Sequence, residues 1–340
     1  MLALGPARFS AFLAALSVSG LAAGSALASK TGPRPLWTFH AGAPLSGPPG
    51  VGADGSLAVG TLDGYVHALG ADGVFRFSYT VAGRVAGSPV VLADGLVLAA
   101  ATSHRLYAIR PDGSLAWTAV IGGGAVGPLV RDADERVWVR TGSGAAVAYS
   151  RRGGVVGFAK LARTMTVGPA AMGRGGVLVG SPGGELGLIG DYGKFRRGAL
   201  PGPLKNVWAH EAGFLALGAG TLRELDLTLG VVWSLDGVDE VFCTSPVVVR
   251  TGSDIRWLSD SGGVSSRVPA PFQLARPSAC AASSLFAVDA RGAVVHLRSS
   301  GDYVRFEDAG GALVGLVPSR PGSLVAAYQD GRVVALKAAF

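Results

Sequence analysis

The chain has 340 residues, of which 49% are hydrophobic and 16% charged, with 53 glycines and a formal net charge of +7. This length exceeds that of a typical single core and favours a repeat or barrel architecture. After the N-terminal segment, no apolar run approaches the roughly 20 residues of a membrane-spanning helix, so we expect no transmembrane segment in the mature chain. Lysine and arginine never occur more than two in a row. We therefore expect no nucleic-acid partner.

Residues 1–28 differ in composition from the rest of the chain. Arg8 is their only charge, residues 9–23 are mainly apolar, and Ala26, Leu27 and Ala28 fit the small-residue cleavage pattern. This predicts a signal peptide over 1–28 and one exported domain over 29–340, periplasmic or secreted. An uncleaved N-terminal anchor is the alternative. Since no cysteine follows the apolar run, we expect no lipid anchor, and the basic balance predicts weak association with anionic envelope surfaces.

A short module recurs along the rest of the chain, with one outer-strand residue about every forty positions. A fixed period of roughly 20–50 residues indicates a repeat architecture, in which each unit buries its apolar face against its neighbours. The recurring residues are Trp37, Phe77, Trp117, Phe158, Arg197, Trp233, Arg267 and Arg305.

Each module reads as four short strands joined by tight turns. In the second module the strands are expected at 89–91, 96–101, 106–109 and 114–117. Asp-Gly pairs separate the apolar runs, as at Asp94 and Asp112, and this dipeptide is the strongest short hairpin signal because glycine tolerates positive φ. Four-stranded sheets repeated radially make a β-propeller.

Counting third strands gives eight units, so the sequence predicts an all-β, eight-bladed β-propeller of four-stranded antiparallel blades. The last unit ends after its third strand at 333–337, whereas the chain begins with an unassigned outer strand at 37–39. Pairing that N-terminal strand into the last blade closes the ring and removes an open edge. An open solenoid is the alternative, but it would need polar caps.

Ala108, Ile109, Gly113 and Trp117 form a pattern that is repeated from Ala68 to Phe77 and, more loosely, in later modules. With the Ser-Pro-Val-Val run at 88–91, it resembles the repeat of pyrroloquinoline-quinone-type (PQQ-like) propellers. It resembles the non-enzymatic propeller subunit of the bacterial outer-membrane assembly machine more than the quinoprotein dehydrogenases. The outer-strand aromatics are expected to pack towards the neighbouring blade; they are Trp37, Phe77, Trp117, Phe158 and Trp233.

Cys243 and Cys280 are the only two cysteines, 37 residues apart, which is about one repeat. In an exported protein two cysteines permit one disulfide, here between adjacent units. Two buried thiols that act as small hydrophobic side chains are the alternative.

A quinoprotein enzyme would be expected to hold a metal ion with Glu, Asn and Asp under the quinone. Asn206 is the only asparagine, and no acidic cluster is placed to help it supply the roughly six to eight oxygen ligands that a hard cation requires. We interpret the aspartates as turn-forming residues. We expect the five histidines to be core or surface residues. We expect no catalytic residue, cofactor or metal site and interpret the chain as a non-enzyme. A degenerate quinoprotein-type enzyme or a small-molecule sensor is the alternative.

Loops on one face of the propeller carry cations that are candidates for binding a protein partner. Connections from an outer strand to the next inner strand emerge on the same face as the loops between second and third strands. On that face Asp236, Asp239 and Glu240 add a local acidic region. Such charge patterning suits recognition of a partner by a scaffold protein of the cell envelope, and ordinary solvated loops are the alternative. The candidate cations are Arg84, Arg105, Lys160, Arg163, Lys205 and Arg276.

Overall fold

The computed structural model describes residues 35–160, 167–171, 176–189, 195–211, 213–281, 283–306, 311–320 and 322–337. Residues Thr31–Phe340 form one compact unit. The predicted signal peptide and Arg163 lie outside the described residues. Within the described residues, no helix is long and apolar enough to cross a membrane.

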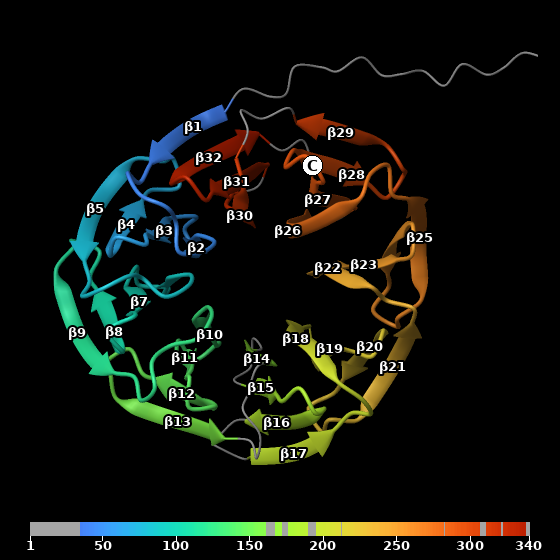
Figure 1. The fold of residues 1–340 in the computed structure, drawn as a ribbon, viewed down its shortest axis with the longest axis horizontal. Helices are drawn as coiled ribbons and strands as arrows, with labels where there is room; N and C mark the ends of the chain where they lie inside the picture. The colour runs from blue at the N-terminus through green and yellow to red at the C-terminus, as the bar shows by residue number, and fades with distance from the viewer. Residues whose placement is uncertain are drawn as a thin grey trace, which may run out of the picture. The chain divides into compact units, whose positions relative to one another are not determined.

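Eight four-stranded antiparallel sheets form the blades of a propeller, as the sequence predicts. Figure 1 shows the blades arranged as a ring, with the first strand of each blade towards the centre and the fourth at the rim. Blades 1–7 are numbered in chain order, and blade 8 contains both ends of the domain.

The strands of the first four blades follow the predicted modules closely. Blade 1 contains β2 (Gly50–Val51), β3 (Leu57–Gly60), β4 (Tyr65–Leu69) and β5 (Phe75–Thr80); blade 2 contains β6 (Val90–Val91), β7 (Val97–Ala101), β8 (Arg105–Ile109) and β9 (Leu115–Val120); blade 3 contains β10 (Val130–Arg131), β11 (Val137–Arg140), β12 (Ala145–Tyr149) and β13 (Val155–Lys160); blade 4 contains β14 (Val167–Ala171), β15 (Val177–Gly180), β16 (Glu185–Ile189) and β17 (Phe195–Ala199).

The inner strands of the later blades are longer than those of blades 1–3. Blade 5 contains β18 (Leu204–His210), β19 (Gly213–Gly218), β20 (Thr221–Leu225) and β21 (Val231–Asp236); blade 6 contains β22 (Glu240–Thr244), β23 (Val247–Thr251), β24 (Asp254–Leu258) and β25 (Val264–Pro269); blade 7 contains β26 (Leu274–Ala281), β27 (Ser284–Asp289), β28 (Val294–Arg298) and β29 (Tyr303–Phe306); blade 8 contains β30 (Leu313–Pro318), β31 (Ser323–Tyr328), β32 (Arg332–Lys337) and β1 (Pro35–His40).

The N-terminal strand closes the ring by completing the last blade. Strand β1 pairs antiparallel with β32, with Trp37 opposite Ala335 and Phe39 opposite Val333, and Figure 1 shows β1 at the rim beside β32. Trp37 and Phe39 pack against a buried cluster that includes Leu57 of blade 1. The first strand therefore joins the last blade to the first, and the prediction of closure is confirmed.

The hydrophobic core lies between the blades, in layers around the ring. Several second strands are buried along their whole length, as in β7, β19 and β27. A neighbouring blade covers each face of these strands, so both sets of alternating side chains leave water. This explains the continuous apolar runs of the sequence and its positive mean hydropathy.

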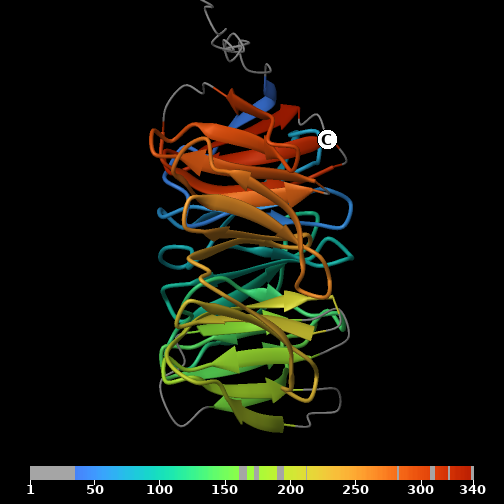
Figure 2. The same ribbon diagram turned by 90° about the vertical axis from the view of Figure 1, so that its right-hand side faces the viewer.

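Loops emerge on two sides of the ring, as Figure 2 shows. We call the side with the blade-to-blade connections and the loops between second and third strands the loop face, and the opposite side the turn face. The amide of Thr102, in a second-to-third-strand loop, donates to the carbonyl of Arg84 in a blade-to-blade connection at 2.8 Å. The two kinds of loop therefore lie together on the loop face, as predicted.

Candidate functional site

Four of the predicted aromatics lie against the turn that joins the third and fourth strands of the next blade. Trp117 Nε1 donates to the carbonyl of Arg151 at 2.6 Å, and a Cβ on Gly153 would lie only 2.8 Å from the Trp117 ring. Gly153 has a φ of +85°, so glycine is needed here both for the backbone conformation and for the close approach of the indole. The same arrangement pairs Trp37 with Gly73, Phe77 with Gly113 and Trp233 with Gly262.

Phe158 does not take this position, and its predicted docking is corrected. In blade 3 the residue opposite Ala148 is Gly157, whereas Trp117 is opposite the equivalent Ala108 in blade 2. A Cβ on Gly157 would lie 3.0 Å from Trp138 of β11, so that buried indole fills the space beside the outer strand. Phe158, one residue further along, is 60% exposed.

Where arginine occupies the outer strand, ion pairs and a ring contact replace the docked aromatic. Arg267 Nε donates to Asp254 at 2.6 Å, and Arg305 Nε donates to Asp289 at 2.6 Å. The guanidinium of Arg197 lies 5.7 Å from the centroid of the Phe195 ring. These arginines stabilise their own blades rather than marking an anion site.

Replacing Trp117 by alanine should lower the free energy of unfolding by about 3 kcal/mol, because large aromatic deletions at packed sites cost roughly 3–5 kcal/mol. The Phe158→Ala substitution is the matched control and should change it by less than about 0.5 kcal/mol, since its ring is largely in water. Urea unfolding of both variants measures the difference. Equal losses would contradict the register assigned to β13.

The inner wall between blades 5, 6 and 7 is joined by side-chain bonds. A disulfide links Cys243 of β22 to Cys280 of β26. Ser278 Oγ donates to the carbonyl of Phe242 at 2.7 Å, and His210 Nδ1 donates to that of Thr244 at 2.6 Å. These contacts tie the first strands of three consecutive blades together.

The predicted loop-face cations are spread around the ring rather than gathered in one place. Arg84 lies in the connection between blades 1 and 2, close to the loop that precedes Arg105. Lys160 ends β13, whereas Lys205 and Arg276 lie within the first strands of blades 5 and 7. All five are exposed. Among the five described cations, only Arg84 and Arg105 are therefore neighbours: Arg84 lies beside the loop that precedes Arg105.

The acidic residues of this face hold its own loops together. Asp236 accepts a hydrogen bond from Thr221 Oγ1 at 2.7 Å. Asp239 Oδ2 accepts from the amide of Gly252 at 2.7 Å, and its carbonyl accepts from Lys205 Nζ at 3.0 Å. Glu240 forms an ion pair with Arg250 at 3.5 Å. The acidic region is thus part of the junction between blades 5 and 6.

Carboxylates in the turns serve the backbone, as the sequence predicts. Asp226 Oδ1 accepts from the amide of Thr228 at 2.7 Å and from that of Gly230 at 2.9 Å. The hydrogen bond from the Thr228 hydroxyl, with these amide bonds, lowers the pKa of Asp226. Asp289 holds the amides of Arg291 and Ala293 in the same way. These groups are ionised turn formers with their acceptors already occupied.

His296 is buried between strands, where it stacks on Phe286 with ring centroids 4.3 Å apart. Its Nε2 shares a hydrogen bond with Ser284 Oγ at 2.9 Å. Burial, and then the charge of Arg298, lower the pKa of His296 from 6.5 to about 4. The expectation of a core histidine is confirmed for this residue.

The low pKa of His296 predicts a loss of stability in acid. The unfolded chain takes up a proton near pH 6.5 and the folded chain only near 4, so this contribution is complete above pH 6.5 and declines as pH falls towards 4. The shift corresponds to about 3 kcal/mol. The His296→Gln substitution should flatten the dependence of unfolding free energy on pH across this window. An unchanged profile would contradict the assignment.

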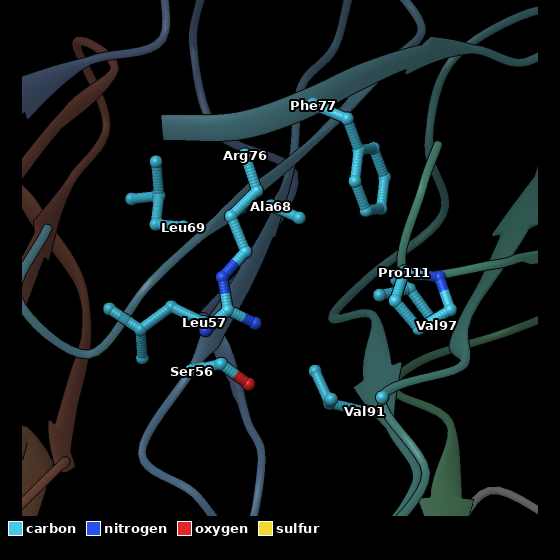
Figure 3. Close-up of a pocket in the computed structure, with 10 residues that line it drawn as sticks. Ser56, Leu57, Ala68, Leu69, Arg76, Phe77, Val91, Val97 and Pro111 are labelled. Atoms are coloured by element: carbon cyan, nitrogen blue, oxygen red, sulfur yellow. The ribbon is translucent and has the colours of Figure 1, made fainter. Parts of the chain in front are cut away.

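A small cleft opens between blades 1 and 2, with a cavity volume of about 10 Å³. In Figure 3, Arg76 extends towards Ser56 while Phe77 lies across from Pro111. This volume is about the room that one water molecule needs. The cleft belongs to the packing between blades.

Comparisons with known proteins agree with this architecture. The family model described as outer membrane protein assembly factor BamB, a PQQ-like repeat family, matches residues 25–182. The crystal structure of BamB from Moraxella catarrhalis is similar, with a TM-score of 0.68 and 17% identity over 88% of this chain and 98% of that chain. Saccharomyces cerevisiae Sqt1 has a TM-score of 0.72 and 10% identity over 91% and 100%.

Two further similarities involve enzymes. A streptogramin B lyase structure has a TM-score of 0.55 and 12% identity, over 88% of this chain and 96% of that chain. A glycerol kinase from Saccharopolyspora erythraea is 35% identical over 153 residues, which cover 40% of this chain and 29% of the kinase. The chain thus spans less than a third of the kinase it matches.

The repeat match begins before the first described strand and ends within blade 4, and the fold similarity extends over most of the chain. The chain is therefore an eight-bladed propeller that resembles BamB in fold, and its residues 25–182 match the PQQ-like repeat model.

Proposed function

We propose that this protein is an exported, non-enzymatic propeller that serves as a protein-interaction scaffold in the cell envelope. The observation that best supports this function is the closed propeller ring, which resembles BamB and contains PQQ-like repeats. A closed ring presents two loop-bearing faces and a rim on a rigid frame, so it can hold a partner without ordering itself first.

The chemistry of the polar residues supports binding rather than catalysis. The turn carboxylates accept hydrogen bonds from backbone amides, and Asp254 and Asp289 pair with outer-strand arginines. The Cys243–Cys280 disulfide supports an oxidising compartment, because such bonds persist outside the cytosol. The apolar N-terminal segment with its Ala-Leu-Ala sequence supports export.

Reversing charge on the loop face should weaken partner capture from the native envelope. The variant Arg84→Glu/Arg276→Glu should retain its fold, since exposed substitutions usually cost less than about 0.5 kcal/mol. Charges at the periphery of a binding interface act mainly through the association rate and its salt dependence. Capture by the wild type should therefore also fall as the salt concentration rises. Arg298→Glu/Arg320→Glu on the turn face carries the same charge change and should capture normally. If neither the charge reversal nor the salt concentration changes capture, the loop face is excluded as the partner-binding surface.

The enzymatic alternative is tested directly on the purified protein. Under the proposed function, adding Ca²⁺ and pyrroloquinoline quinone should leave the absorbance spectrum equal to the sum of its components, with no metal retained after dialysis. A shifted quinone band with stoichiometric calcium would overturn the non-enzymatic assignment.

A further inference from the structure

The outer edge of blade 3 exposes several apolar side chains. Strand β13 is the last strand of its sheet, and its other side has no strand partner within the described part of the chain. The exposed fractions are 62% for Val155, 53% for Val156 and 60% for Phe158. Consecutive exposed apolar side chains on an unpaired edge invite the addition of another strand.

Other outer strands carry protection that β13 lacks. Arginines interrupt the edges of β5, β17, β25 and β29, whereas the only charge in β13 is Lys160 at its end. Charged residues within an edge strand disfavour pairing with another chain. Strands β1 and β9 carry no lysine, arginine, aspartate or glutamate, and β21 carries only Asp236 at its end. A docked tryptophan protects each of these three: Trp117 Nε1 donates to the carbonyl of Arg151, Trp233 Nε1 donates to that of Asp260, and Trp37 lies against Gly73. Blade 3 thus presents the least protected edge of this group.

The exposure of Phe158 follows from the packing of blade 3. Trp138 fills the space beside Gly157 and donates its Nε1 to buried Asp132 at 2.8 Å. The indole that stabilises this blade therefore comes from the second strand, and the outer strand contributes no docked aromatic. Its apolar side chains remain available at the rim.

The charges at the ends of this edge indicate what can pair with it. Arg152 precedes β13 and Lys160 ends it, and both are exposed. A second copy paired antiparallel would place Arg152 near Lys160 of the other copy, and a parallel pair would align like residues. Like charges directly opposite destabilise strand pairing. A strand with acidic ends would instead meet opposite charge at both positions.

We propose that β13 is a strand-addition site for an extended, apolar segment of a partner protein with acidic residues at both ends. This rests on the proposed function as a protein binder and specifies one surface and the partner's chemistry. The unpaired backbone groups of β13 supply the ladder, Val156 and Phe158 supply apolar contacts, and the two cations set the orientation and selectivity.

The probe is a short synthetic peptide that alternates valine and threonine and carries glutamates at both ends. Fluorescence anisotropy of the labelled peptide should show saturable binding, at least about ten-fold tighter than for the same peptide with terminal lysines. Amide hydrogen exchange in residues 155–160 should slow in the complex. Binding that does not distinguish the two peptides, or no saturable binding, would overturn the proposal.

Variants distinguish binding at the edge of β13 from nonspecific binding to exposed apolar surface. Phe158→Asp should reduce affinity at least about ten-fold, whereas Val232→Asp on the equally exposed outer strand β21 should not. The double reversal Arg152→Glu/Lys160→Glu should invert the preference in favour of the lysine peptide. Unfolding midpoints close to the wild type establish that each variant is folded.

Two outcomes distinguish this inference from the broader function. If a native partner is still captured but the peptide does not bind at β13, the strand-addition site is wrong and the scaffold function stands. If the peptide binds as expected but no native protein is captured, the scaffold function fails. A dimer that depends on Phe158 in sedimentation equilibrium would assign the edge to a second copy and overturn the proposed partner chemistry.

Discussion

Deletion of residues 37–39 should open the ring and lower the free energy of unfolding by several kcal/mol, well beyond the roughly 0.5–3 kcal/mol of a typical single substitution. The deletion removes the pairing of β1 with β32. It also removes Trp37 and Phe39 from the cluster that joins blades 8 and 1. Strand β32 would then become an open edge, which promotes association between chains.

Urea unfolding and size-exclusion chromatography measure these two effects. The control is a truncation that stops before Pro35, which leaves β1 intact and should unfold like the chain that contains residues 29–340. A 37–39 deletion that remains monodisperse and unfolds at the control midpoint would contradict closure by the N-terminal strand.

Loss of the Cys243–Cys280 disulfide should destabilise the domain by about 4 kcal/mol in the chain-entropy description of a crosslink closing a loop of this length. The crosslinked residues are 37 apart and join the first strands of blades 6 and 7. Reduction of the wild type and the Cys243→Ser/Cys280→Ser variant should therefore lower the unfolding midpoint to a similar extent.

The two perturbations act as controls for each other. The serine variant should be insensitive to reductant, since it has no disulfide to lose. A wild-type midpoint that is the same with and without reductant, after mass analysis has verified reduction, would contradict a stabilising role for this bond.

The period and the mismatched ends of the chain made the architecture predictable. Trp37 lies in an outer strand with no preceding module, and the last module ends at its third strand. Closing the ring satisfies both observations because it pairs the unpaired edges. Aspartate-glycine turns bounded the strands correctly since their conformational preference is local. The period and these turns do not depend on tertiary contacts.

The side-chain details depended on tertiary packing that the period does not encode. Phe158 matched the forty-residue spacing, but Trp138 occupies the space beside Gly157, and this shifts the docking position by one residue. A tryptophan in the second strand together with a glycine in the fourth was the available signal. Single-residue register is set by such contacts between strands.

The five described cations among the candidates lie at the loop-face ends of their strands or in loop-face connections, and they are spread around the ring. Loop order along the chain determines the face, whereas distance around the ring depends on which blades carry each cation. The acidic residues near Asp239 bond to loops of blades 5 and 6, which sequence spacing alone does not reveal. The exposed edge of β13 likewise depends on the undocked position of Phe158, which the forty-residue spacing does not indicate.

If this propeller serves as a scaffold, it is bound to a partner in the cell, and its native assembly state reports this. We would release the protein from the envelope of the cells that make it with mild detergent, after brief cross-linking, and determine the mass and composition of the species. We expect a complex larger than the monomer that contains a second protein in fixed stoichiometry. A lone monomer that carries quinone and oxidises a small substrate would contradict it.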